Sequence, residues 1–254
     1  MLNALAGARL QELARTTFQL PEEFLVLGAD TAPEALCWYG ANISPIEADD
    51  AALDAFADRI LAKRKGVGSV VGERAAVERL WMRMSDSWSI PREERWSQPL
   101  MEATGAPSAA PHPWLRPARA GEEALVFPAA VAMFREEVGF DPLGYDGGRA
   151  YRRRVDALIA QGRTYVVMAE GAVAFKADVG AVFGDVAQIH GVWVDPDLRG
   201  RGLARGAMAS LVQQVRRNHA PRVSLYVNDY NAPARRAYDA AGFVTVGELA
   251  TVLF

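Results

Sequence analysis

The feature that most restricts the fold is a segment in which an apolar strand runs through a glycine-rich loop directly into an amphipathic helix. It reads VWVDPDLRGRGLA and covers residues 192–204. The first N–H groups of a helix lack intrahelical partners and the helix dipole adds positive charge, so such a loop is suited to bind an anion. Gly200 and Gly202 allow a phosphate close to the backbone, and Arg199 and Arg201 supply cationic donors. An ordinary strand-to-helix turn is the structural alternative.

The spacing of this loop differs from two common phosphate-binding motifs. It lacks the Gly-x-Gly-x-x-Gly of the dinucleotide fold, and the sequence contains no Gly-Lys-Ser/Thr of a nucleoside-triphosphate loop. It has the form Arg/Gln-x-x-Gly-x-Gly/Ala, with Arg199, Gly202 and Ala204 at the defining positions. A second pattern follows further along the chain: Leu225-Tyr226-Val227-x-x-x-Asn231-x-x-Ala234-x-x-x-Tyr238-x-x-x-Gly242-Phe243.

In this order and at this separation, the two patterns resemble the coenzyme motifs of the Gcn5-related N-acetyltransferases (GNAT), over about residues 123–254. The resemblance implies acetyl-coenzyme A as cosubstrate and no metal. It also implies direct attack of an acceptor amine on the thioester in a ternary complex, without a covalent enzyme intermediate.

The resemblance assigns roles to individual residues. The backbone of Val192, Trp193 and Val194 would pair with the pantetheine arm. Asn231 matches a residue that contacts the coenzyme or orients the last helix, and Tyr238 matches the tyrosine that protonates the departing thiolate. For Tyr238, packing on an amphipathic helix is the alternative. The pyrophosphate would bind to loop amides, which belong to Arg199, Gly200, Arg201, Gly202, Leu203 and Ala204.

One position departs from the family pattern. Many members carry a glutamate on the strand before the loop as base for the incoming amine, and the matching position here is close to Gln188, which cannot accept that proton. His190 shares a face with Gln188 and is the nearest titratable candidate for the base. A structural, hydrogen-bonded histidine is the alternative, with the proton passing to water or to a carboxylate such as Glu170 or Asp178.

The strand over residues 172–182 carries two charged residues on one face. Lys176 and Asp178 lie opposite Phe175, Ala177 and Val179 if the strand is regular. They form either a mutually paired face or part of the acceptor cleft, and the pattern does not separate the two.

The proline-rich stretch 102–122 divides the chain, because its four prolines remove backbone donors and restrict the residues before them. We therefore predict an N-terminal α/β module over 1–105, a linker over 106–122 and an acetyltransferase domain over 123–254. The first module resembles a degenerate half of the same fold, in an actinobacterial branch of the family with an N-terminal domain of unknown function. The residues that carry this likeness are 35–45 and 98–100. Its glycine segment 63–68 follows a helix instead of a strand, so we expect one coenzyme site per chain.

Periodicity predicts the elements of both modules. In the first, strands are expected at 24–27, 35–43 and 69–72, with helices at 49–63 and 74–84. In the second, helices are expected at 127–138, 149–161, 203–218 and 232–241, and strands at 164–169, 172–182, 186–194, 222–227 and 243–254. The predicted fold class is α+β, with a mixed sheet flanked by helices in the C-terminal module.

Composition excludes several classes of protein. Half of the 254 residues are apolar and 23% are charged, which argues against disorder, and a net charge of −3 argues against nucleic-acid binding. Cys37 is the one cysteine, so an internal disulfide and a cysteine-based zinc site are both excluded. The apolar runs are shorter than the ~20 residues of a membrane span. We expect a soluble cytoplasmic protein, for which a homodimer is compatible.

The expected function is N-acyl transfer to a primary amine of a small molecule or peptide. Two alternatives remain open at this point. One is an acetyl-coenzyme A sensor or scaffold with weak catalysis, for which Gln188 is the sequence support. The other is a tandem acetyltransferase resembling mycothiol synthase.

Overall fold

The computed structural model describes residues 3–14, 22–29, 32–144 and 146–254. The chain divides into two compact units that do not follow chain order. Unit 1 comprises Met1–Met101 together with the two later segments Tyr226–Asn231 and Thr245–Phe254. Unit 2 comprises Glu102–Leu225 and Ala232–Val244. The C-terminal end of the chain therefore belongs to the same unit as the beginning of the chain. Local sequence patterns do not reveal this arrangement.

Unit 1 is a mixed sheet with helices. Its strands run in the order β1-β2-β3-β4-β11-β5, where β11 is Phe243–Leu253. β3 and β4 are parallel, and the pairs β1–β2, β2–β3 and β4–β11 are antiparallel. The 3₁₀ turn Ser85–Ser87 follows α3. The elements are α1 (Ala4–Ala14), β1 (Phe24–Ala29), β2 (Ala32–Tyr39), β3 (Ile43–Ile46), α2 (Asp50–Ala62), β4 (Ser69–Glu73), α3 (Arg74–Met84) and β5 (Glu93–Ala103).

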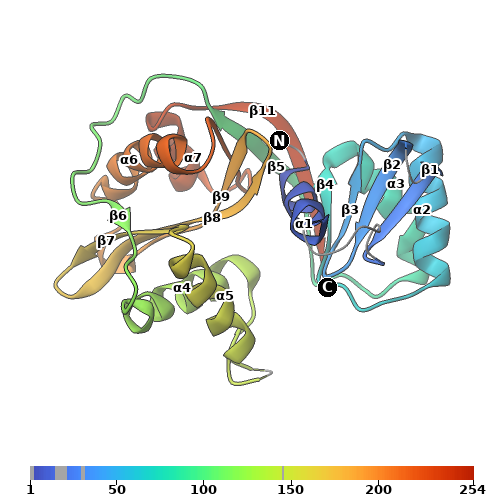
Figure 1. Cartoon of the computed structure of the whole chain (residues 1–254), viewed down its shortest axis with the longest axis horizontal. Helices are drawn as coiled ribbons and strands as arrows, with labels where there is room; N and C mark the ends of the chain where they lie inside the picture. The colour runs from blue at the N-terminus through green and yellow to red at the C-terminus, as the bar shows by residue number, and fades with distance from the viewer. Residues whose placement is uncertain (1–2, 15–21, 30–31, 145) are drawn as a thin grey trace. The chain divides into compact units, whose positions relative to one another are not determined.

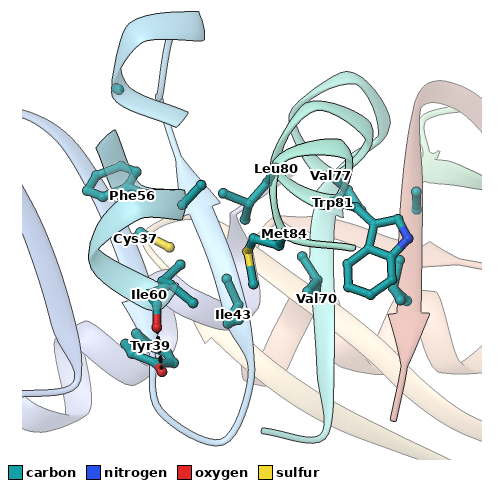
Figure 2. Packing of buried hydrophobic residues seen from close by; sticks show 14 of the residues in the cluster. Cys37, Tyr39, Ile43, Phe56, Ile60, Val70, Val77, Leu80, Trp81 and Met84 are labelled. Carbon is teal, nitrogen blue, oxygen red and sulfur yellow. Dashed lines mark hydrogen bonds between the residues drawn. The ribbon is translucent and has the colours of Figure 1, made fainter. Parts of the chain in front are cut away.

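The core of unit 1 follows the two-residue alternation of its strands. Cys37 and Tyr39 of β2 point to the side of α2 and α3, where they pack with Phe56 and Leu80 (Figure 2). Trp38, between them, packs with α1 in a second cluster. Burial raises the pKa of the Cys37 thiol to about 12, so this thiol is protonated and inert at neutral pH.

Unit 2 has the predicted mixed sheet flanked by helices. Its strands run β6-β7-β8-β9-β10, antiparallel except for the parallel pair β9 and β10. Within this unit, α4 and α5 cover one face of the sheet, and α6 and α7 cover the other (Figure 1). The elements are β6 (Arg116–Pro117), α4 (Glu123–Val138), α5 (Arg149–Ala160), β7 (Thr164–Ala169), β8 (Ala172–Phe183), β9 (Val186–Val194), α6 (Leu203–Asn218), β10 (Arg222–Tyr226) and α7 (Ala232–Ala240).

The proline-rich stretch predicted as a linker is packed onto α6. The N–H of His112 donates to the carbonyl of Gly206 at 3.0 Å, and the hydroxyl of Ser210 donates to the carbonyl of His112 at 2.8 Å. Further along, Gln214 donates to the carbonyl of Leu115, whose side chain is buried. Side chains of α6 thus hydrogen-bond to the backbone of this stretch, where the prolines prevent regular strand pairing. The stretch belongs to unit 2.

The same order of elements occurs twice along the chain. Strands β1, β2 and β3 lead through α2, β4 and α3 to β5, and strands β7, β8 and β9 lead through α6, β10 and α7 to β11. In both repeats the first three strands are antiparallel neighbours, and the third is parallel to the fourth. The loop between β3 and α2 is therefore the counterpart of the loop between β9 and α6.

Candidate coenzyme and catalytic site

The loop between β9 and α6 has a backbone that its glycines make possible. Asp195 first closes a 3₁₀ turn, Pro196–Leu198, by accepting a hydrogen bond from the N–H of Asp197 at 2.9 Å. Gly200 and Gly202 then adopt φ of +74° and +81°, the left-handed region that side chains disfavour. A Cβ built on either glycine meets no atom within 4 Å. These two positions are glycine because of their backbone conformation, and the space above them is open.

The helix that follows begins without a cap. Gly202 is the N-cap residue of α6, and no side chain accepts a hydrogen bond there. In the part of the chain that the structure describes, the N–H groups of residues 200–204 have no acceptor, whereas that of Arg205 donates to the carbonyl of Gly202. The first turn also contains no acidic residue. An array of unsatisfied donors at a helix N-terminus is the arrangement that binds phosphate groups.

Arg199 has a different environment from the one expected of a phosphate ligand. Its N–H donates to the carbonyl of Pro196 at 3.3 Å, and its Nε donates to the carbonyl of Val194 at 3.0 Å. Its Nη2 contacts both carboxylate oxygens of Glu136, at 2.9 and 2.8 Å. Glu136 also accepts from Nε1 of Trp193 at 3.2 Å. Arg199 therefore braces the loop against α4, which sequence reasoning missed because Glu136 lies 63 residues away.

The strand before the loop leaves one backbone edge unpaired. Strands β9 and β10 are in register only from Val186 to Gln188, opposite residues 222–224, although β9 continues to Val194. Val192, Trp193 and Val194 therefore lie beyond the ladder with β10. At the last pair of this ladder Ser224 is in register with Gln188, and the Ser224 hydroxyl is buried without a hydrogen-bond partner.

His190 is packed against its neighbours on the sheet. Its Nε2 lies 2.9 Å from Oε1 of Gln188, an acceptor, so Nε2 carries the proton and Nδ1 holds the lone pair. A Cβ on Gly180 would lie 2.3 Å from that Nδ1, so the imidazole ring lies against the backbone of β8 at this glycine. Burial, with a smaller contribution from the charge of Arg154, lowers the pKa of His190 to about 4.

Lys176 and Asp178 form a buried ion pair on β8. Lys176 is 1% exposed, and its Nζ contacts Oδ2 of Asp178. The other carboxylate oxygen of Asp178 accepts from the hydroxyl of Thr164 at 2.8 Å. Gly191, at φ +57°, leaves room for this pair, because a Cβ there would lie 3.1 Å from Oδ2 of Asp178. The paired arrangement is the one present, and it lies beside β9 in the stretch that precedes the loop.

The last helix carries Tyr238 with its ring inside. Tyr238 is 7% exposed, and its ring packs 6.0 Å from that of Phe243. Its hydroxyl bonds to none of the described residues and is not among the buried polar atoms without a partner, so it still reaches solvent. Burial raises the pKa of the Tyr238 phenol well above 10. Asn231 precedes α7 in the segment assigned to unit 1, where its N–H donates to the carbonyl of Asn228.

Comparison with known proteins agrees with this arrangement. Residues 81–243, more than half of the chain, match the acetyltransferase (GNAT) family. The chain belongs to this family. Residues 23–126 match a domain of unknown function (DUF4081). The predicted family and its N-terminal domain of unknown function are both confirmed, and the GNAT family is a family of acyltransferases.

Solved structures show the same fold over nearly the whole chain. A GCN5-related N-acetyltransferase from Kribbella flavida has a TM-score of 0.59 at 17% identity, covering 100% of this chain and 95% of its own. An acetyltransferase of the GNAT family from Colwellia psychrerythraea has a TM-score of 0.60 at 11% identity, covering 91% of this chain and 85% of its own. The predicted fold class, a mixed sheet flanked by helices, is confirmed.

A curated relative matches a shorter stretch. Over 61 residues, or 24% of this chain, the sequence is 39% identical to mycothiol acetyltransferase of Brachybacterium faecium. The chain spans 18% of that protein's length in this match.

Among the residues that the structure describes, no helix is both long and apolar enough to cross a membrane. Over the same residues, no cluster of three or more His, Cys, Asp or Glu could hold a metal ion.

Proposed function

We propose that this GNAT chain transfers the acetyl group of acetyl-coenzyme A to a primary amine of a small molecule or peptide. The observation that carries the proposal is the uncapped loop 199–204 at the end of a strand whose ladder with β10 covers only Val186–Gln188 and does not reach Val192–Val194. An anion site and an extended unpaired backbone edge are the two features that a long ligand with a pyrophosphate and an amide-containing arm requires.

The residues present fit this coenzyme. Open space lies above Gly200 and Gly202, so the pyrophosphate can approach the free amides of residues 200–204 without displacing protein atoms. The unpaired edge of Val192–Val194 can pair with the amides of the pantetheine arm in the manner of an added strand.

In the proposed reaction the acceptor nitrogen attacks the thioester carbonyl carbon. A C–N bond forms, the C–S bond breaks, and the thiolate leaves with the electron pair of that bond. Tyr238 donates its proton to the sulfur, and the proton lost by the amine restores the phenol through solvent. The raised pKa keeps Tyr238 protonated at neutral pH, so its hydroxyl is a donor throughout the pH range in which the amine is reactive.

The environment of His190 makes it a weak candidate for the catalytic base. An alkylammonium has a pKa near 10.4, so transfer of its proton to a group with a pKa of about 4 is uphill by ~6 units, or roughly 8 kcal/mol. A base works best with a pKa near the working pH. We therefore expect the amine to bind already neutral, with water taking the proton released after attack.

The proposal is tested with the full chain by measuring thiol release from acetyl-coenzyme A in the presence of amines. The local identity to mycothiol acetyltransferases favours small-molecule amines as the first acceptors to test. Release that depends on both acetyl-coenzyme A and an amine would support the proposal. Firm coenzyme binding without release from any amine would instead support the sensor, which the replacement of a glutamate by the neutral Gln188 favours.

A further inference from the structure

Unit 2 contains a cleft of about 470 Å³ beside the coenzyme loop. One wall is the proline-rich segment 109–113, and the other is the first turn of α6 with Arg201 and Arg205. Its volume lies within the ~300–1,000 Å³ of small-molecule sites. The cleft shares Gly202 with the loop, so a ligand anchored on the loop amides would extend directly into it.

The charge of the cleft is positive. Arg201 and Arg205 are exposed, and neither has an ion-pair partner among the residues that the structure describes. No carboxylate lines the cleft. This contrasts with Arg199 beside it, whose guanidinium is held by Glu136. Two uncommitted guanidinium groups at a helix N-terminus favour a second phosphate beyond the one on the loop amides.

His112 adds a neutral donor to the opposite wall. Its Nδ1 accepts a hydrogen bond from the N–H of Trp114 at 3.3 Å, which leaves the proton on Nε2. Burial lowers the pKa of His112, so the ring is neutral at pH 7. Nε2–H has no acceptor within the described parts of the chain and is available to a ligand oxygen.

The two walls are held at a fixed separation. Gly206 lies where they meet, because a Cβ there would lie 3.0 Å from the carbonyl oxygen of Ala110. The hydrogen bond from His112 N–H to the carbonyl of Gly206 fixes the same point. The rings of Pro111 and Pro113 supply an apolar surface on the wall that faces the arginines. The cleft thus combines a flat apolar side with a cationic side.

We propose that this cleft binds the adenosine 3′-phosphate end of the coenzyme, with Arg205 and Arg201 on the 3′-phosphate, His112 Nε2–H as a further donor, and the two prolines against the base. The inference rests on the proposed function. It assigns to the proline-rich segment, which precedes the sheet of unit 2, the discrimination between coenzyme A and forms that lack the 3′-phosphate.

The experiment is a calorimetric titration of the full chain with acetyl-coenzyme A and with acetyl-dephospho-coenzyme A. A charge-assisted hydrogen bond contributes about 1.5–3 kcal/mol, so we expect wild type to bind the 3′-phosphorylated form ~10–100-fold more tightly. Arg205→Gln should weaken acetyl-coenzyme A binding ~10-fold and leave acetyl-dephospho-coenzyme A binding unchanged. Arg217→Gln, at the exposed other end of the same helix, is the matched control and should change neither.

Two results would overturn the inference while leaving the proposed function intact. One is equal affinity of wild type for both ligands. The other is a loss in Arg205→Gln that is the same for both, since this would show a general electrostatic effect of the arginine. Absence of binding for both ligands would overturn the proposed function and this inference with it, and is distinguished from the first two by the missing heat of binding.

Discussion

The two repeats differ in what occupies the N-terminus of the helix after their third strand. In unit 1, Asp49 caps α2: its carboxylate accepts from the N–H of Ala52 at 2.8 Å, and Asp50 follows in the first turn. In unit 2, Gly202 precedes α6 with no side-chain cap and no acidic residue in the first turn. The same topological position is closed by a carboxylate in one unit and left open in the other.

We expect this difference to decide whether the N-terminus of each helix can accept an anion. A capping carboxylate satisfies the amides that a phosphate would otherwise contact, and its charge repels a phosphate. The open helix of unit 2 lacks that intrinsic cap, which contributes about 1 kcal/mol elsewhere. A bound phosphate would supply the missing acceptors.

The helices that follow the fourth strand of each repeat, α3 in unit 1 and α7 in unit 2, also differ. The buried residues of α3 in unit 1 are apolar throughout: Val77, Leu80, Trp81 and Met84. In unit 2, α7 buries Tyr238, whose hydroxyl reaches solvent. One helix serves the core alone, whereas the other carries a hydroxyl that the core does not use.

Removing the Tyr238 hydroxyl is expected to have the largest effect. Tyr238→Phe keeps the packed ring, so coenzyme affinity should change less than about twofold, while kcat should fall ~10²–10⁴-fold, the usual contribution of a positioned acid. Steady-state kinetics with calorimetry measure both quantities. Tyr39→Phe is the control, because its buried hydroxyl bonds to the backbone of Lys63 and Lys65 in unit 1 and its loss should lower stability alone. An unchanged kcat in Tyr238→Phe would remove the tyrosine from the mechanism.

Making the unit 2 helix resemble that of unit 1 is expected to weaken coenzyme binding. Gly202→Asp places a carboxylate at the N-cap, and loss of even one charge-assisted bond of about 1.5–3 kcal/mol, together with repulsion, should lower affinity about 100-fold. Gly184→Asp is the matched control, since Gly184 also has a positive φ, +57°, and open surroundings, and it lies in the β8–β9 turn at the other end of these strands. Wild-type affinity in Gly202→Asp would show that the coenzyme does not use this loop.

Local patterns in the sequence were sufficient for most elements of unit 2. The predicted bounds of α6 and of the strands β7 and β9 agree with the structure, because each has a strong periodicity and ends at a glycine or turn. The helix α4 begins four residues earlier than predicted, at Glu123, although Pro128 then lies inside it. In unit 1, α1 and β5 were missed, and the single strand predicted over 35–43 is wrong, because the structure has two strands there, β2 and β3, which pair antiparallel.

The reasons for the misses are physical. β5 reads EERWSQPLMEA, and its charges and internal proline argue against a strand. Its polar residues are satisfied by distant partners instead: Ser97 donates to Glu248, and Gln98 bonds to Thr251 and Asn228. The same kind of long-range contact hides the bracing of Arg199 by Glu136. Motif spacing indicated the loop and Tyr238, but the roles assigned to the site residues remain predictions.

Acidification is expected to destabilise unit 2 through His190. Unit 1 has no counterpart of this residue, because its corresponding strand β3 contains no titratable side chain. The folded-state pKa of about 4 lies below the ordinary 6.5, so between these values the unfolded chain binds a proton that the folded chain does not. The contribution of the neutral His190 to the free energy of unfolding is therefore complete above pH 6.5. It is lost as the pH falls toward 4, and the loss is at most about 3 kcal/mol. Denaturant unfolding at several pH values should show a shallower dependence in His190→Gln. In wild type, a rate limb due to His190 would lie near pH 4, so a limb near 6.5 that vanishes in His190→Gln would contradict this assignment.

The smallest effect is expected from opening the helix of unit 1. Asp49→Ala removes the cap of α2 and should lower the free energy of unfolding by about 1 kcal/mol, which denaturant titration measures. Coenzyme affinity and a stoichiometry near one per chain should not change, because the helix keeps Asp50 in its first turn and the loop before it has no glycine in the left-handed conformation that Gly200 and Gly202 adopt. A stoichiometry near two in wild type would contradict the closed state of this loop. A second coenzyme bound only by Asp49→Ala would show that the cap alone separates the two units, and that the glycines of unit 2 are less important than its missing carboxylate.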